Sequence, residues 1–68
     1  MNNIDMRCKF QFVGEVVVRV VNYNQSEHFH CSIIQPNGSG KDYTQCIGVP
    51  KKYQSAMNGL IEEIKQSF

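Results

Sequence analysis

Tryptophan is absent from this sequence, proline occurs twice, and neither sign of charge predominates. Seven Lys and Arg residues against six Asp and Glu residues give a net charge of +1. The concentrated basic composition that is typical of a nucleic-acid-binding protein is therefore missing. No apolar run approaches the roughly 18 residues that cross a bilayer, and the polar stretch Met1–Asp5 is not followed by the apolar region of a signal peptide. We expect a cytoplasmic protein without a membrane span.

Cysteine is also scarce: Cys8, Cys31 and Cys46 form an odd set, and no Cys-x-x-Cys pair is present. Without a signal peptide, reduced thiols are the simplest interpretation of such a set. Cys8 and Cys31 are predicted to be small core residues.

The chain length limits the size of the hydrophobic core. A domain of 68 residues buries only about 60% of the surface of its unfolded chain, so its stability is marginal unless a staple or a partner subunit contributes. A content of 41% hydrophobic and 19% charged residues suits a globular domain. We expect one domain over 1–68, with a flexible N-terminus at 1–6, an antiparallel sheet over 7–49 and a helix over 50–67.

The first half of the sheet is predicted from alternation between Arg7 and Val21, where the even-numbered residues from Cys8 to Val20 are apolar apart from Gly14. A period of two is typical of a strand with one buried face, so this even set is predicted to face the core. Gly14 marks either a bend in one long strand or, with Glu15, a tight turn between two strands. The unbroken alternation favours the bent strand.

The second half of the sheet follows a polar connection at 24–26. Residues 28–35 alternate, with Phe29, Cys31 and Ile33 on one face, and Pro36–Gly40 is the strongest turn signal in the chain. A further strand over 42–49 is predicted to point Tyr43, Gln45, Ile47 and Val49 inward and Cys46 outward.

A helical pattern replaces the strand pattern after Pro50, which suits the first position of a helix. Apolar residues recur at helical spacing and form one stripe, with Gly59 on the opposite, solvated side; the stripe consists of Tyr53, Met57, Leu60, Ile61, Ile64 and Phe68. The predicted fold class is α+β: a three-stranded, possibly four-stranded, antiparallel sheet packed on one C-terminal helix, in the order β-β-β-α.

The motifs that suggest chemistry are incomplete. His28 and His30 share a strand face and Cys46 could join them, but zinc needs a fourth ligand and none is evident. The segment Gly38–Lys41 lacks the earlier glycine, the following Ser or Thr and the helix of a phosphate-binding loop. A nucleophile, a base and an orienting group are not found together, and a domain of this size has little room for a substrate pocket. We therefore expect no enzyme activity, no metal and no cofactor.

One helix covers one face of a sheet, so the other face is the predicted interaction face. It is expected to carry β-branched residues beside cationic ones, with Arg7 and Lys9 at its margin, and such a mixed patch is typical of a contact surface; its residues are Val13, Val17, Arg19, Val21, His28, His30 and Ile34. We expect a protein-interaction module, such as a subunit, an adaptor or an inhibitor of the kind that mobile elements encode, whose partner is another protein or a second copy in a homodimer. Lys51 and Lys52, in the first turn of the helix, form a weaker anion-attracting spot.

The alternative is binding of nucleic acid on the sheet face. A three-stranded sheet followed by a C-terminal helix is similar in element order to the AP2 and integrase amino-terminal DNA-binding domains, which lay the sheet in a major groove. Those domains are rich in arginine, whereas Arg7, Lys9 and Arg19 are the cations expected here. Recognition of RNA would need exposed aromatic rings, and Phe10, Phe12 and Phe29 share the inward alternation. With these rings outward, the nucleic-acid hypothesis would become the stronger one.

Overall fold

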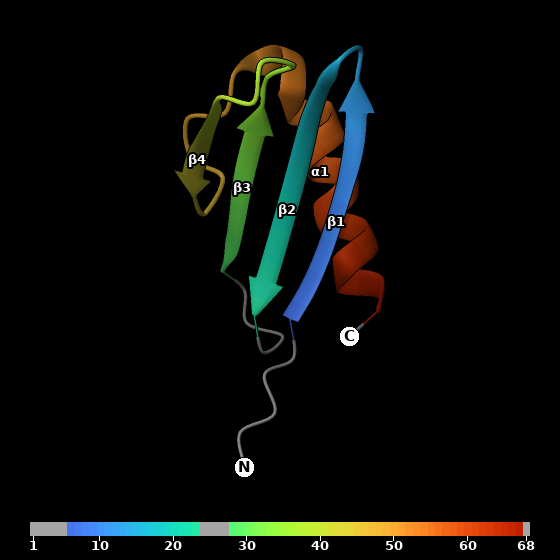
Figure 1. Cartoon of the computed structure of the whole chain (residues 1–68). Coiled ribbons are helices and arrows are strands. Elements are labelled where there is room, and N and C mark those ends of the chain that lie inside the picture. The colour runs from blue at the N-terminus through green and yellow to red at the C-terminus, as the bar shows by residue number, and fades with distance from the viewer. Residues whose placement is uncertain (1–5, 24–27, 68) are drawn as a thin grey trace.

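The computed structural model describes residues 6–23 and 28–67 of the chain. Four strands precede one helix, in the order β1 (Met6–Val13), β2 (Val16–Tyr23), β3 (Phe29–Ile34), β4 (Gly40–Thr44) and α1 (Lys51–Gln66). The strands form one antiparallel sheet in the spatial order β1-β2-β3-β4 (Figure 1). The α+β class is confirmed with four strands. The predictions for the N-terminal segment up to residue 5, for the connection at 24–26 and for Phe68 concern residues outside the described ranges.

The segment from Arg7 to Val21 folds as a hairpin, so the predicted bent single strand is wrong and the alternative turn is correct. Val13 pairs with Val16, which leaves Gly14 and Glu15 as a two-residue connection. Gly14 has a φ of 63°. A positive φ at the first central residue is what tight hairpin turns require, and glycine adopts it without the clash that a Cβ causes.

The hairpin reverses which residues of the first strand face the core. Two paired residues lie on the same face, so Val13 faces the helix with Val16, Val18 and Val20, and the even-numbered residues of β1 face away. Phe10 and Phe12 are each 61% exposed, whereas Phe29 is buried at 7%. The prediction of an inward face is therefore wrong for Phe10, Phe12 and Cys8, and correct for Phe29.

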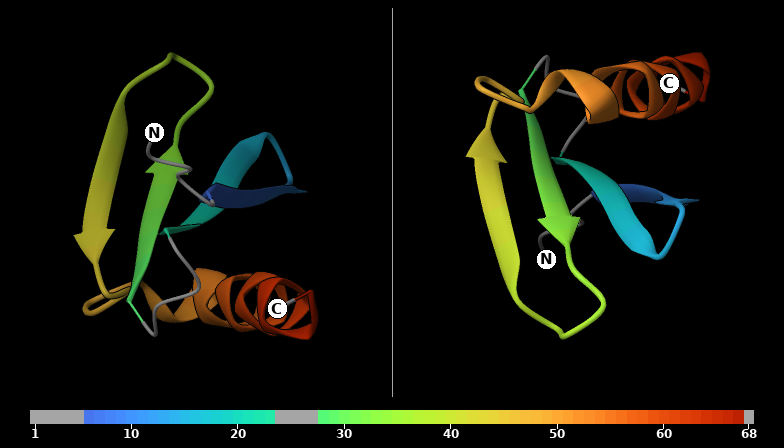
Figure 2. Two further views of the ribbon diagram at one scale, coloured as in Figure 1. Left: turned by 90° about the horizontal axis from the view of Figure 1, so that it is seen from below. Right: turned by 90° about the horizontal axis from the view of Figure 1, so that it is seen from above.

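Helix α1 lies against one face of the sheet, over β1 and β2, and the other face has no covering element among the described residues (Figure 2). Its apolar stripe meets the inward residues of β2 and β3 in one core, whose buried members are Val18, Val20, Phe29, Cys31, Ile33, Val49, Tyr53, Met57, Leu60 and Ile64. Pro50 occupies the N-cap position, one residue before the helix begins, and Gly59 is exposed as expected. The helical part of the prediction is confirmed.

The β3–β4 hairpin confirms the turn predicted at Pro36–Gly40, except that Gly40 is already the first residue of β4; within the turn, Gly38 N–H donates to the carbonyl of Gln35. The last strand is shorter than predicted, because Gln45 and Cys46 have φ values of 56° and 57°, outside the strand region. Ile47 is consequently 72% exposed instead of inward.

Cys46 turns back toward the core and forms a disulfide with the buried Cys31. The expectation of three reduced thiols is wrong for this pair in the structure, and so is the outward placement of Cys46. Cys8 is a free, exposed cysteine rather than a core residue. The disulfide links β3 to the segment that follows β4.

Candidate functional site

The candidate site is the sheet surface opposite α1, called here the open face. Strand register arranges its side chains in four rows that cross the sheet, and the rows are Phe12–Val17–Ile34–Gly40, Phe10–Arg19–Ser32–Asp42, Cys8–Val21–His30–Thr44 and Met6–Tyr23. The first row lies beside the Gly14–Glu15 turn, and the last lies at the opposite end of β1 and β2 (Figure 1). His28 lies on the same side, immediately before β3.

Most of the predicted interaction face lies on the open face. Five residues from β2 and β3 occupy its rows as expected, namely Val17, Arg19, Val21, His30 and Ile34. Val13 does not: it packs against the core on the helix side, so its placement was wrong. Arg7 and Lys9 also face α1, where Arg7 Nη1 donates to Ser67 Oγ at 3.2 Å and Lys9 Nζ lies 3.7 Å from Glu63 Oε1.

The largest apolar side chains of the open face were not predicted there. Met6, Phe10, Phe12 and Tyr23 are each more than half exposed, and the rings of Phe10 and Phe12 pack edge to face with centroids 6.2 Å apart. The signal that could have identified the two phenylalanines is the Gly14–Glu15 pair, because a two-residue turn shifts the buried set from even to odd positions.

A polar row crosses the middle of the open face. Arg19 Nη2 donates to Ser32 Oγ at 3.4 Å, and Ser32 Oγ donates to Asp42 Oδ1 at 2.7 Å. His30 Nε2 lies 3.7 Å from Asp42 Oδ2. The hydrogen bond from Ser32, and secondarily the neighbouring His30 and Arg19, lower the pKa of Asp42. Arg19 and Asp42 together leave this row without net charge.

Replacing Ser32 with alanine is expected to raise the pKa of Asp42 toward its ordinary value, because the largest cause of its lowering is removed. A pH titration of the Asp42 carboxyl carbon by NMR measures this. Because the folded pKa lies below the unfolded one, the interaction contributes to stability above the unfolded pKa and is lost as the pH falls through the folded pKa. Ser39→Ala is the matched control, since Ser39 bonds Asn37 instead. An unchanged Asp42 pKa in Ser32→Ala would show that the hydrogen bond is not its cause.

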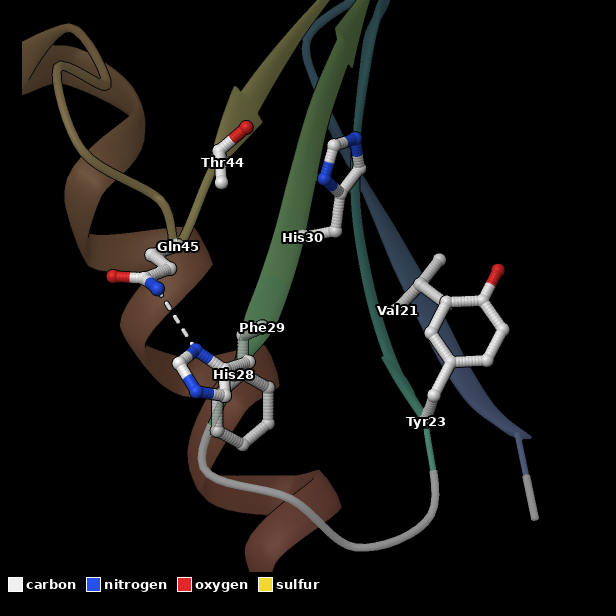
Figure 3. Close-up of a pocket in the computed structure, with 7 residues that line it drawn as sticks. All are labelled: Val21, Tyr23, His28, Phe29, His30, Thr44 and Gln45. Atoms are coloured by element: carbon white, nitrogen blue, oxygen red, sulfur yellow. Dashed lines mark hydrogen bonds between the residues drawn. The ribbon is translucent and has the colours of Figure 1, made fainter. Parts of the chain in front are cut away.

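A groove of about 440 Å³ lies at the end of the open face away from the Gly14–Glu15 turn; its lining residues are Val21, Tyr23, His28, Phe29, His30, Thr44 and Gln45. Tyr23 stands on the opposite side of the groove from His28 and Gln45, with His30 between them (Figure 3). Gln45 Nε2 donates to His28 Nδ1 at 2.8 Å, so a neutral His28 carries its proton on Nε2. The rings of Tyr23, Phe29 and the two histidines thus line an open, mainly apolar hollow.

The histidines do not assemble a metal site with Cys46, because Cys46 is bonded to Cys31. Over residues 6–23 and 28–67, no group of three or more His, Cys, Asp or Glu side chains could hold a metal ion. Lys51 and Lys52 are exposed at the start of α1, with Lys52 Nζ 5.1 Å from the centre of the Tyr53 ring. They lie on a different element from the open face.

The open face therefore offers three things: protruding phenylalanines, a neutral polar row and a ring-lined groove. No helix in the described ranges combines the length and the hydrophobicity needed to cross a bilayer. Comparisons of this chain with protein-family models, with curated proteins and with solved structures find no match.

Proposed function

We propose that this chain is a non-enzymatic protein-interaction module, such as a subunit, an adaptor or an inhibitor, that acts through its open face. One observation carries the proposal. Within residues 6–23 and 28–67, five large hydrophobic residues are more than half exposed: Met6, Phe10, Phe12 and Tyr23 lie on this face, and Ile47 lies elsewhere. The largest apolar patch that a monomeric protein exposes, typically about 300–600 Å², is often functional.

The composition of the face supports a protein partner. Aromatic residues, methionine and arginine are enriched in protein interfaces, and binding energy concentrates on a few such side chains. The four exposed hydrophobic residues present roughly 450 Å², taking about 200 Å² for a large side chain. A standard interface buries about 800 Å² on each partner, so these residues supply more than half of it. The half-buried Val17, Val21 and Ile34 lie beside them on β2 and β3.

Binding of single-stranded nucleic acid is the second candidate, because the exposed Phe10 and Phe12 rings beside Arg19 could stack on bases. The same hairpin that turns these rings outward, however, places Arg7 and Lys9 on the helix side. Arg19 is then the only permanent cation among the described open-face residues. Affinity for nucleic acid depends on such cations, and one of them predicts a slope of only about −0.7 in log affinity against log salt. The absence of Arg7 and Lys9 from the open face therefore disfavours nucleic-acid binding more than the exposed Phe10 and Phe12 rings favour it.

A cytoplasmic location is part of the same proposal. Disulfides in the cytoplasm are rare and usually transient. A cytoplasmic location therefore implies that the Cys31–Cys46 disulfide is reversibly reduced there.

Photo-crosslinking tests this proposal. A photo-reactive phenylalanine analogue is incorporated in place of Phe12, and the protein is irradiated in the organism that encodes the chain. We expect adducts with protein, identified by mass spectrometry, because Phe12 is exposed on the proposed contact surface. Those adducts should disappear when Val17, the cross-strand neighbour of Phe12, is changed by Val17→Lys.

The same analogue in place of the exposed Ile47, which does not line the open face, is the matched control. Equal yields of adduct from positions 12 and 47 would contradict the proposal. Adducts with nucleotides, together with oligonucleotide binding whose salt slope is about −3 or steeper, would favour the second candidate.

A further inference from the structure

The open face carries a protrusion and a hollow at opposite corners. The protrusion is the Phe10–Phe12 pair on the edge strand β1, in the two rows nearest the Gly14–Glu15 turn. The hollow is the groove between Tyr23 and His28, which extends across β2 and β3 to Thr44 at the end of β4. Register places them diagonally: Phe10 lies at the β1 end of the row that contains Arg19, Ser32 and Asp42, and the groove lies in the rows beyond it.

We infer that the partner of the open face is a second copy of this chain, and that Phe10 of each copy enters the groove of the other. This inference rests on the proposed function and names its partner and its central contact. Consider two copies stacked with their open faces together. A two-fold axis that lies midway between the two sheets, perpendicular to the diagonal joining the Phe10–Phe12 pair to the groove, places the Phe10–Phe12 pair of each copy over the groove of the other. Each copy then supplies one protrusion and one hollow, which is the self-complementarity that a two-fold interface requires.

The charges on the face favour a second copy over a charged partner. Arg19 donates to Ser32, which donates to Asp42, so the positive and negative charges in the middle of the face balance each other. A strongly acidic or basic partner would gain little from it, whereas a copy of the same neutral face meets no excess of like charge.

The size and the shape of the two features also correspond. The groove volume of about 440 Å³ exceeds that of one phenylalanine ring, and Tyr23, His28 and His30 provide ring surfaces against which a ring can pack. The exposed apolar area estimated for the face is more than half of what a standard interface buries on one partner. A contact that also covers the polar row and Val17 and Ile34 reaches that size.

The experiment measures mass against protein concentration by analytical ultracentrifugation for the wild type and for variants of the full chain. Phe10→Ala should raise the dimer dissociation constant roughly 100- to 1000-fold, because the contact occurs twice in a two-fold dimer and a buried aromatic anchor is a typical hot spot. Thr44→Trp, which fills the groove from an exposed position, should weaken the dimer similarly. Ile47→Ala, an apolar truncation outside the face, should leave it unchanged.

Mixing Phe10→Ala with Thr44→Trp provides the decisive comparison. In a heterodimer, Phe10 of the Thr44→Trp copy enters the unchanged groove of the Phe10→Ala copy. The filled groove of the Thr44→Trp copy faces only the alanine of its partner. The mixture should therefore form heterodimers at concentrations where neither variant alone dimerises. Circular dichroism of each variant verifies that it is folded.

Each failure has a distinct meaning. A wild type that remains monomeric at millimolar concentration overturns the inference, yet protein adducts at position 12 would still support the proposed function. A wild-type dimer that is insensitive to Phe10→Ala, or a mixture that does not recover dimerisation, overturns the placement of Phe10 in the groove.

Discussion

Replacing Ile64 with alanine is expected to lower the free energy of unfolding by about 2–5 kcal/mol, because the side chain is fully buried between α1 and the sheet. The loss has two parts, the transfer free energy of the removed methyl and methylene groups and the cavity that remains. For a domain whose total stability is on the order of 5 kcal/mol, this loss leaves a large unfolded fraction. Urea denaturation followed by circular dichroism measures it, at one fixed protein concentration because dimerisation would add to apparent stability.

Ile47→Ala provides the control, since it is the same substitution at a side chain that is 72% exposed. Its expected effect is within about 0.5 kcal/mol. Equal losses in the two variants would contradict the assignment of the core and of the solvated turn.

Reduction of the Cys31–Cys46 disulfide is expected to lower the free energy of unfolding by about 3 kcal/mol, the chain-entropy value for a loop of 15 residues. The closed loop contains most of β3 and all of β4. Without the bond, the unfolded chain gains conformational freedom and the folded chain keeps its other contacts. Urea midpoints with and without a reducing agent measure the difference.

Cys8→Ser is the control for the disulfide, because Cys8 is exposed and free. The reductant should shift the urea midpoint of this variant as much as that of the wild type. A midpoint that does not respond to reductant in either protein would mean that the disulfide does not form or does not stabilise the fold.

Part of the candidate site could be predicted from the sequence, because the alternation along β2 and β3 is locally clear. Val17, Val21, His30 and Ile34 could be placed on the face opposite the helix for that reason. The protruding rings could not, because apolar residues occur at both parities of β1: Phe10 and Phe12 at even positions and Val13 at an odd one. The groove could not be predicted either, since Tyr23, His28 and Gln45 come from three separate segments.

The disulfide shows a similar limit. Spacing alone assigns no partner to Cys46, and alternation pointed its side chain outward. Two successive residues with positive φ end β4 early and bring Cys46 back to Cys31. Such backbone conformations are uncommon for residues other than glycine, so they could not be predicted from the residue types at Gln45 and Cys46.

The α+β class, the turn within Pro36–Gly40 and the buried stripe of the helix could all be predicted from the sequence alone, because each depends on residues that are close together in the chain. The side of β1 that meets α1 could not be predicted in this way and depends on tertiary packing. A side-chain period of two is equally consistent with either face, so the choice falls to the hairpin at Gly14 and to the valines of β2 that the helix covers. That choice exposes Phe10 and Phe12, removes Arg7 and Lys9 from the open face and thereby shapes the surface on which the proposed function depends.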